Sequence, residues 1–345
     1  MDRLEQLRGW VAQLHPDCAF EISVASADAS FRRYFRIRFA DAADCIENTG
    51  SNTRIVMDAP PDHEDCRPFL HVAKLLQEAG VNVPEVHAQD LGQGFLLLSD
   101  LGSTTYLSAL NEAKLNTARV AELYAEALGA LACIQRASRP GVLPEYDRAL
   151  LLRELELFPV WYVARHKGMS LSDADSTALY AAFDSILNVN LSEPQVFVHR
   201  DFHSRNLMLT TPNPGILDFQ DAVYGPLTYD LVSLFKDAYI EWDEELTLDW
   251  LARYWDTSRK LGIPVRDNFA DFHRDYEFMG AQRHLKVLGI FTRLYHRDGK
   301  DGYLKDMPLV LKHLRKTCQR YRELHPLARL LDKLEPVDIQ TGYTF

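Results

Sequence analysis

The sequence has fewer basic than acidic residues and no long apolar run. Lysine and arginine total 38 against 49 aspartates and glutamates, and the formal net charge is -11. Because phosphate backbones bind basic surfaces, nucleic acid is not expected as a partner. The acidity would suit a cationic substrate, although most cytosolic proteins are acidic too. No stretch approaches the roughly 20 apolar residues that span a bilayer, so no membrane association is expected.

Closely spaced cysteines and a signal-like N-terminus are also lacking. The cysteines are scattered and form no C-x-x-C pair: Cys18, Cys45, Cys66, Cys133 and Cys318. This pattern predicts free thiols in a reducing compartment, with neither a disulfide framework nor a zinc site. Charged residues occupy the positions after Met1 where a signal peptide has its apolar run. The chain is therefore predicted to be cytoplasmic, and no protein partner is evident.

The apolar pattern divides the chain of 345 residues into two predicted lobes, 1–100 and 101–345. The first is β-rich, with an opening helix over Leu4–Leu14, a second helix over Phe69–Leu76, and strands at Phe20–Val24, Tyr34–Phe39, Arg54–Met57, Val83–His87 and Gly94–Leu98. The second is mainly helical, with helices at Thr117–Arg136, Ala149–His166, Ser172–Asn188, Tyr229–Glu241 and Phe269–His296. The fold class is α+β, in two lobes.

Three segments interrupt this pattern. The polar residues 41–53 separate two strands and are typical of a hairpin loop. Pro159 lies inside a helical run and is expected to kink or end it. The segment Gln195–Asp218 alternates short apolar runs with polar loops, which predicts a strand hairpin inserted among the helices.

That inserted hairpin carries the most informative motif. The residues from His199 to Asn206 have the pattern H-x-D-x-x-x-x-N, and Asp218-Phe219 follow after a further apolar run. Phosphoryl transfer needs a carboxylate that receives the proton of the attacking hydroxyl, and oxygen ligands for Mg²⁺. We predict Asp201 as the catalytic base, with Asn206 and Asp218 as the Mg²⁺ ligands and ATP as the phosphoryl donor.

Residues beside this motif have less specific predictions. His199 is expected to brace the loop by hydrogen bonding, and Asp230 to tie the helix that it opens to the catalytic loop. His203 either reaches the substrate or is solvent-exposed. Asp221 either contacts metal or substrate, or caps a helix or turn. Only Gln220–Tyr224 separate Asp218-Phe219 from Gly225-Pro226, which is too short for an activation loop, so a protein substrate is not expected.

The segment from His199 to Asp230 resembles the aminoglycoside phosphotransferase/choline kinase family, a branch of the protein-kinase-like fold. Within that family, further segments resemble the anomeric sugar kinases of bacterial cell-wall recycling: Ser30–Arg36, Met57–Pro61, Met279–Val287 and Arg297–Lys300. The resemblance implies ATP-dependent phosphorylation of the anomeric (C1) hydroxyl of N-acetylmuramate or N-acetylglucosamine. The alternatives are an aminoglycoside- or choline-type kinase and an inactive regulatory binding module.

The resemblance also implies a nucleotide-binding role for residues 1–100, with the metal and sugar sites in 101–345. Ser30, Phe31, Arg32 and Arg33 lie where a kinase has its phosphate-covering loop, and Ser99, Asp100 and Leu101 lie at the hinge. The third strand lacks the lysine that kinases place there. Arg32 is the first candidate to replace that lysine, and Arg33 is the second.

Three basic residues share one face of a predicted helix. Arg283, Lys286 and Arg293 are spaced at i, i+3 and i+10, and no acidic residue lies between Met279 and Arg297. Such a face would suit an anion, either a sugar carboxylate or the phosphates of ATP. The alternative is an ordinary solvated helix face.

Overall fold

A five-stranded antiparallel sheet forms the centre of the first of two units into which the chain divides. The computed structural model describes residues 2–27, 31–40 and 52–336. The first unit comprises Met1–Ala109 and Arg205–Asp221, and the second comprises Leu110–Ser204 and Ala222–Phe345. The predicted division into a nucleotide-binding lobe and a catalytic lobe at residue 100 is a division by function, and it stays a prediction.

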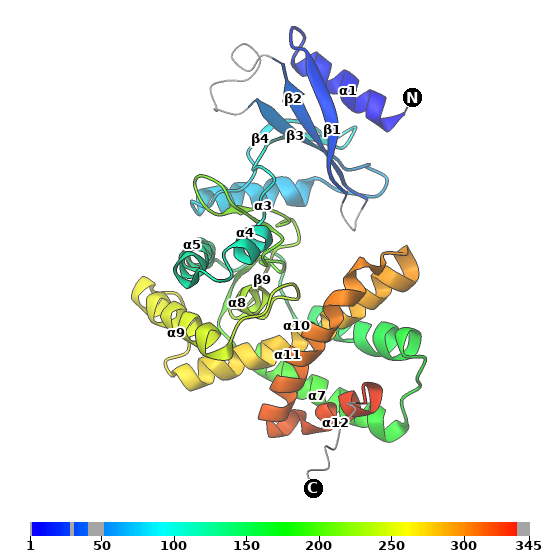
Figure 1. The fold of residues 1–345 in the computed structure, drawn as a ribbon, viewed down its shortest axis with the longest axis vertical. Coiled ribbons are helices and arrows are strands. Elements are labelled where there is room, and N and C mark those ends of the chain that lie inside the picture. The colour runs from blue at the N-terminus through cyan, green and yellow to red at the C-terminus, as the bar shows by residue number, and fades with distance from the viewer. Residues whose placement is uncertain (1, 28–30, 41–51, 337–345) are drawn as a thin grey trace. The chain divides into compact units, whose positions relative to one another are not determined.

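The sheet of the first unit has the order β1-β2-β3-β5-β4 (Figure 1). Its strands are β1 (Phe20–Ala27), β2 (Arg33–Phe39), β3 (Thr53–Asp58), β4 (Val86–Asp90) and β5 (Phe95–Ser99), and the helices of this unit are α1 (Arg3–Leu14), α3 (Arg67–Glu78) and α4 (Tyr106–Glu112). Strand β4 begins three residues later than predicted. The predicted run contained Pro84, which has no N–H for the ladder.

The two faces of the sheet contact different parts of the unit, because side chains alternate between the faces along each strand. Phe35, Ile37 and Phe39 of β2 pack with the buried residues of α1 in one apolar core. Tyr34 and Arg36, one position out of step, face the opposite side and line a cavity. One strand therefore supplies both the core under α1 and a wall of the candidate site.

A short hairpin completes the first unit, although it comes from the middle of the chain. Strands β7 (Leu207–Met208) and β8 (Gly215–Ile216) pair antiparallel. The Leu217 N–H donates to the Asn206 carbonyl at 2.9 Å, which places the residues at the two ends of the hairpin next to each other. Behind them, the Phe219 ring packs on Phe69 of α3 with a centroid distance of 4.7 Å. The predicted hairpin over Gln195–Asp218 is thus confirmed in part: its last two apolar runs pair with each other, whereas the first run forms a strand, β6 (Gln195–Val198), that pairs with β9 (Val223–Pro226) in the second unit.

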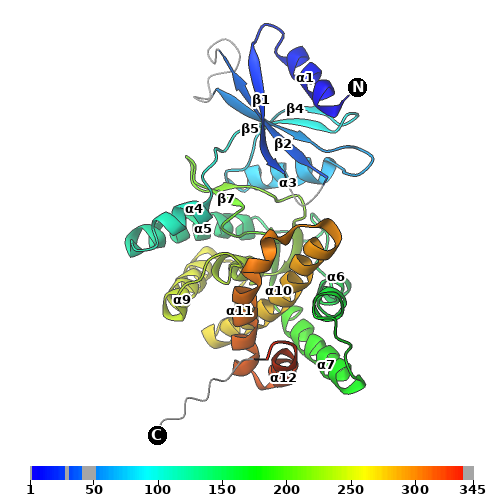
Figure 2. The ribbon, with the colours of Figure 1, turned by 45° about the vertical axis from the view of Figure 1, so that its right-hand side comes forward.

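The second unit is mainly helical, as predicted (Figure 2). Its longest helix, α10 (Phe269–Asp298), is largely buried and packs against η1, α6, α7, α8 and α11. The other elements are α5 (Thr117–Arg136), α6 (Arg148–Leu155), η1 (Phe158–His166), α7 (Asp173–Asn190), β6 (Gln195–Val198), β9 (Val223–Pro226), α8 (Tyr229–Phe235), α9 (Glu244–Leu261), η2 (Asp301–Asp306), α11 (Met307–Arg320), η3 (Arg322–Leu324) and α12 (His325–Leu334).

Two predicted helices differ in the structure. The run Ala149–His166 breaks before Pro159 as expected, but its second half is a π-helix, η1. Leu157, the residue just before η1, packs closely on Gly289 of α10, since a Cβ added at Gly289 would lie 2.5 Å from Leu157 Cβ. The helix predicted to reach Glu241 ends at Phe235, because Asp237 turns back to accept hydrogen bonds from Ser204.

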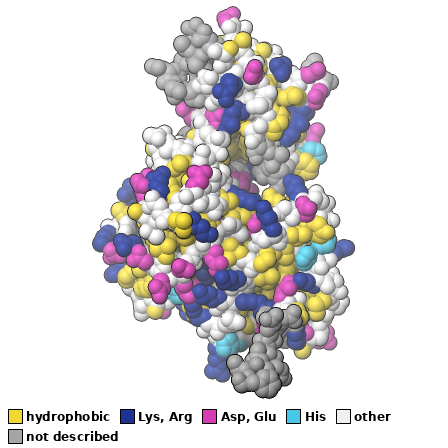
Figure 3. All heavy atoms as spheres, in the orientation of Figure 1, with side chains coloured by type: hydrophobic (Ala, Val, Ile, Leu, Met, Phe, Trp, Pro, Cys, Tyr) yellow, Lys and Arg dark blue, Asp and Glu magenta, His cyan; other side chains and the backbone are white. Residues whose placement is uncertain are grey.

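Further sequence expectations can be compared with the described residues. The predicted loop 41–53 lies mostly outside them. Cys18 is disulfide-bonded, so the prediction of free thiols is wrong there, while Cys66, Cys133 and Cys318 are free. Sequence spacing misled here because distant cysteines can meet in the fold. Within residues 2–27, 31–40 and 52–336, no helix has the length and apolarity needed to cross a bilayer. On the face seen in Figure 3, acidic and basic side chains are interspersed.

Candidate active site

The loop that carries Asp201 is held by hydrogen bonds to its backbone. Strands β6 and β9 pair antiparallel and deliver the chain to His199. The Asp230 carboxylate accepts the His199 N–H at 2.7 Å and the Arg200 N–H at 3.0 Å. The Asp201 N–H donates to Nδ1 of His199 at 3.2 Å. The predicted bracing roles of His199 and Asp230 are confirmed.

Asp201 lies among cations. Burial alone would raise the pKa of its carboxyl, but the positive charges of Arg283, Lys286, His203 and Arg200 outweigh burial and hold that pKa well below its usual range. Nη2 of Arg283 lies 3.4 Å from Oδ1 of Asp201. Asp201 is therefore ionised throughout the neutral range, and 41% of its side chain remains exposed.

The basic face of α10 is not a solvated face, contrary to that alternative. Arg283 and Lys286 are 6% and 5% exposed, and both donate to the Tyr229 hydroxyl, at 3.2 and 2.8 Å. Lys286 also pairs with Glu154 at 3.0 Å. Arg293 is partly exposed, and burial and then Arg297 lower the pKa of its guanidinium. Its Nε is buried and makes no hydrogen bond within the described part of the chain.

The two predicted metal ligands lie together in the first unit. The Asn206 side-chain amide is 3.3 Å from Oδ2 of Asp218. Gln220 donates to Oδ1 of Asp218 at 2.8 Å, and Arg32 Nη2 lies 3.8 Å from the same oxygen. Asp218 has a φ of +61°, a conformation that non-glycine residues rarely adopt and that is concentrated at functional sites.

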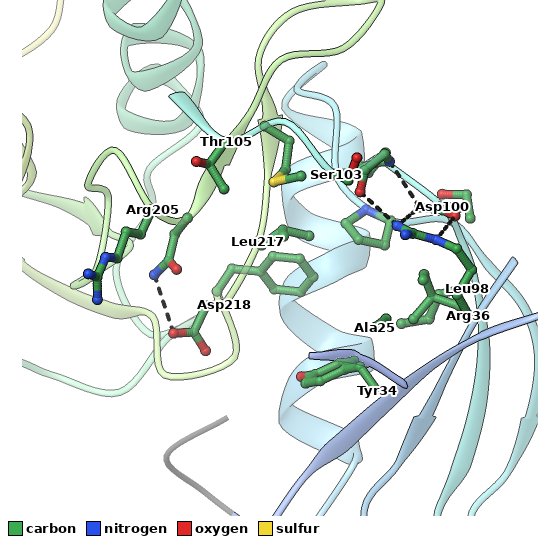
Figure 4. Close-up of a pocket in the computed structure, with 18 of the residues that line it drawn as sticks. Ala25, Tyr34, Arg36, Leu98, Asp100, Ser103, Thr105, Arg205, Leu217 and Asp218 are labelled. Carbon is green, nitrogen blue, oxygen red and sulfur yellow. Dashed lines mark hydrogen bonds and ion pairs between the residues drawn. The ribbon is translucent and has the colours of Figure 1, made fainter. Parts of the chain in front are cut away.

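A cavity of about 360 Å³ adjoins this pair within the first unit. Figure 4 shows Ala25 and Tyr34 on one side, Leu217 and Asp218 on another, and Arg36 directed at Asp100. The lining is largely apolar and includes the predicted hinge residues Ser99, Asp100 and Leu101. Other residues that line the cavity are Ala25, Tyr34, Ile55, Pro84, Leu98, Met208, Leu217 and Phe219. A largely apolar cavity with a small set of polar groups, here Arg36 and Asp100 on one side and Asp218 on another, is the usual form of a small-molecule or cofactor site.

The side chains of the predicted phosphate-covering loop separate in the structure. Ser30 lies outside the described residues. Phe31 is 64% exposed and stacks on His63 at a centroid distance of 4.5 Å, and its N–H donates to Glu64 at 3.3 Å. Arg33 donates to the fully buried Asp58 at 2.6 Å. Of the two arginines, Arg32 is the one that the structure brings to Asp218.

His203 and Asp221 are the two residues beside the motif whose predictions are open. His203 is partly exposed and meets the Tyr239 ring edge-on at 5.4 Å. Asp221 is exposed, and Gln220 Nε2 lies 3.5 Å from its Oδ2. Their substrate roles stay predictions.

Sequence reasoning missed several residues that shape the site. Arg36 pairs with Asp100 through two hydrogen bonds of 2.6 and 3.0 Å at the cavity wall, and this pair lowers the pKa of Asp100 against the effect of burial. Asp237 holds Ser204, and Glu154 binds Lys286. Arg36 could have been found from the sequence, because an arginine that alternates with apolar residues in a strand (R-x-R, Arg36 and Arg38) lies on the face opposite the core. Nothing local marks Glu154, since its partners lie far along the chain.

The fold resembles that of solved choline kinases and aminoglycoside phosphotransferases, which have the protein-kinase-like fold. A choline kinase from Streptococcus pneumoniae superposes with a TM-score of 0.63 at 12% identity, covering 91% of this chain and 100% of that one. An ADP-bound aminoglycoside phosphotransferase gives a TM-score of 0.58 at 13% identity, covering 91% and 98%. At such identities the likeness establishes the fold alone, and it confirms the predicted fold class.

The chain belongs to the phosphotransferase enzyme family, whose model matches residues 21–262. It is 48% identical over 346 aligned residues, covering 100% of both chains, to an N-acetylmuramate/N-acetylglucosamine kinase of Neisseria meningitidis. It is 46% identical to a kinase of the same name from Pseudomonas aeruginosa, with 96% and 97% covered. The protein is therefore a phosphotransferase that acts on an alcohol group, and the resemblance seen in the sequence is confirmed.

Proposed function

We propose that this protein transfers the γ-phosphoryl group of ATP to the C1 hydroxyl of N-acetylmuramate and N-acetylglucosamine, in the recycling of peptidoglycan. The observation that carries the choice of acceptor is the identity of 45–48% with kinases named for these two sugars, over nearly the full length of the chain. The residues around Asp201 and Asp218 supply the chemistry. The cytoplasm, where ATP is available, is the proposed location.

In this proposal Asp201 orients the sugar hydroxyl and receives its proton. A carboxylate with a depressed pKa is a weak base, so it accepts a hydrogen bond in the ground state and takes the proton late. That timing suits a loose phosphoryl-transfer transition state, in which the nucleophile gains little bonding before the phosphoryl group leaves its donor. The Asp201 carboxylate therefore contributes mainly by positioning.

Asn206 and Asp218 have the oxygen ligands that Mg²⁺ prefers, and Mg²⁺ commonly keeps several waters beside one or two protein ligands. The two side chains, 3.3 Å apart, would hold it with the amide oxygen of Asn206 turned toward the ion. When bound, Mg²⁺ neutralises charge on the transferring phosphoryl group. The strained φ of Asp218 is consistent with a backbone held to aim this carboxylate.

The cavity of the first unit suits an adenine base in size and apolarity. The Ser99 N–H already donates to the Glu85 carbonyl at 2.9 Å, so we assign the hinge hydrogen bonds to the backbone of Asp100 and Leu101. The backbone of Ser30 and Phe31 would cover the phosphates. This assigns the base to one end of the cavity and the phosphates to the end at Asp218.

Arg32 is our candidate for the cation that replaces the strand lysine. We expect Arg32→Ala to raise the KM for ATP by roughly tenfold, because a charge-assisted hydrogen bond contributes on the order of 1.5–3 kcal/mol. The KM for the sugar should change much less. Steady-state kinetics with each substrate varied in turn provides the measurement.

Arg33→Ala is the matched control, since Arg33 is committed to the buried Asp58. It should lower the melting temperature while the KM for ATP stays within about twofold of wild type. An unchanged KM for ATP in Arg32→Ala would remove Arg32 from the nucleotide site. A rise in Arg33→Ala alone would transfer the role to Arg33.

The basic face of α10 divides in this proposal. Arg283 and Lys286 have internal partners, so they act on the substrate only through Asp201 and its loop. Arg293, with its Nε unsatisfied among the described residues, is the member with capacity for the carboxylate of N-acetylmuramate. His203 and Asp221 remain proposed substrate contacts.

The acceptor assignment predicts the order of four specificity constants. We expect kcat/KM for N-acetylmuramate and N-acetylglucosamine to exceed that for kanamycin and for choline by about 10⁴-fold or more, the discrimination that sites built to hydrogen-bond their substrate achieve. Arg293→Met should lower kcat/KM for N-acetylmuramate more than for N-acetylglucosamine, which has no carboxylate. A preference for kanamycin or choline would establish the second candidate, an antibiotic- or choline-type kinase of the same fold.

A further inference from the structure

One buried carboxylate of the second unit binds four donors at once. Glu154 of α6 is 6% exposed. Its Oε1 accepts from Arg200 Nη2 at 2.5 Å and from Lys286 Nζ at 3.0 Å. Its Oε2 accepts from the Tyr146 hydroxyl and from Gln282 Nε2 at 3.1 Å. Every hydrogen-bonding position of this buried charge is used, which is the arrangement that makes a buried carboxylate tolerable.

The charge state of Glu154 follows from these partners. Burial raises the pKa of a carboxyl, but Lys286 and Arg200 overcome burial and lower the pKa of Glu154 to about 2. Glu154 is therefore an anion at neutral pH. It balances two cations that would otherwise be buried beside Asp201.

Arg200, the residue before Asp201, has an unusual backbone. Its φ is +76°, and Arg200 and Asp218 are the only non-glycine residues with positive φ in the part of the chain that the structure describes. Such a conformation is unfavourable for a residue with a Cβ and persists only where the surroundings hold it. The peptide that links Arg200 to Asp201 thus depends on restraint from outside the loop.

Contacts from several parts of the second unit restrain Arg200. Its N–H donates to Asp230 of α8 at 3.0 Å. Its carbonyl accepts from Nη1 of Arg283 of α10 at 2.7 Å. Its guanidinium is bound by Glu154 of α6 and lies over the Tyr146 ring at 5.5 Å. The contacts with Glu154 and Tyr146 are made by the Arg200 side chain, and Glu154 is a charged partner of its guanidinium.

We propose that Glu154 is a positioning residue for phosphoryl transfer: by holding the Arg200 side chain, it keeps the peptide before Asp201 in its left-handed conformation and the Asp201 carboxylate in place. This inference rests on the proposed role of Asp201. Glu154 touches no reacting atom, and it acts through Arg200. Changing it should therefore affect turnover and leave the binding of ATP, whose cavity lies in the other unit, as it is.

The test compares Glu154→Gln with Glu156→Gln in the full-length protein. Glu156 is the exposed C-cap of the same helix, so the two changes remove the same charge two positions apart. Protein competent to bind Mg·ATP is counted by titration, and kcat is expressed per competent molecule. We expect kcat of Glu154→Gln to fall about 10²-fold, the cost of a misplacement near 1 Å, with the KM for ATP and for sugar within about twofold. Glu156→Gln should match wild type.

A double-mutant cycle with Arg200→Met separates positioning from general destabilisation. If Glu154 acts through Arg200, the double variant Glu154→Gln/Arg200→Met is no slower than the slower single variant. The double variant leaves no unpaired arginine, and Lys286 keeps the Tyr229 hydroxyl as a partner. The inference would be overturned if the loss of kcat in the double variant equalled the product of the losses in the two single variants. It would also be overturned if Glu154→Gln had a normal kcat per competent molecule. An active Asp201→Asn variant would instead overturn the proposed function on which it rests.

Discussion

Replacing Asp201 with asparagine is expected to lower kcat by about 10²- to 10⁴-fold, the range for loss of a general base. The amide cannot receive the proton of the attacking hydroxyl. The KM for ATP should change little, because the cavity that we propose for the nucleotide lies among residues of the other unit. Single-turnover assays with saturating substrates measure the fall in the rate of phosphoryl transfer.

The fold should tolerate this change. Arg283 loses its ionic contact with Asp201 but keeps the Arg200 carbonyl and the Tyr229 hydroxyl as acceptors. Asp256→Asn, an exposed carboxylate on α9 paired with Lys260, is the control and should leave kcat unchanged. If Asp201→Asn keeps more than about a tenth of wild-type kcat, Asp201 is not the base.

Replacing Asp218 with alanine is expected to abolish the tightening of ATP binding by Mg²⁺. The change removes a carboxylate ligand, so the loss should be at least the roughly 10- to 100-fold seen when residues that merely support a metal ligand are changed. Calorimetric titration with ATP, with and without Mg²⁺, measures the difference between the two affinities.

Asp221→Ala provides the comparison, because Asp221 is an exposed carboxylate three positions further on. It should keep the full Mg²⁺ effect. If Mg²⁺ still tightens ATP binding to Asp218→Ala as in wild type, the metal is held elsewhere. If the effect is lost in Asp221→Ala instead, that residue is the ligand.

Features with a local cause could be predicted from the sequence. Helix α5 has its predicted bounds, because a regular apolar period and the Asn116 N-cap act within one segment. The hydrogen bond between His199 and the Asp201 N–H spans two residues, so the spacing of the motif was enough. The kinase-like fold could be predicted from the same motif, because H-x-D-x-x-x-x-N lies between short apolar runs that predict strands.

Features set by packing could not be predicted. Arg283 and Lys286 looked like a surface face because nothing in α10 shows that Glu154 and Tyr229 lie against it. Gln282 and Glu154, hydrogen-bonded in the structure, are 128 positions apart in the sequence. Arg33 and Arg32 are adjacent and chemically identical, and only the partners that the sheet supplies, Asp58 and Asp218, separate their roles.

The position of the phosphate in the product tests the central claim most directly. The purified protein is incubated with Mg·ATP and N-acetylmuramate, and phosphorus–proton correlation NMR identifies the proton coupled to the new phosphate. The account predicts coupling to the anomeric proton, as in a sugar 1-phosphate, and formation of this product by Asp201→Asn that is slower by about 10²-fold or more. Phosphate on any other hydroxyl of the sugar would contradict it.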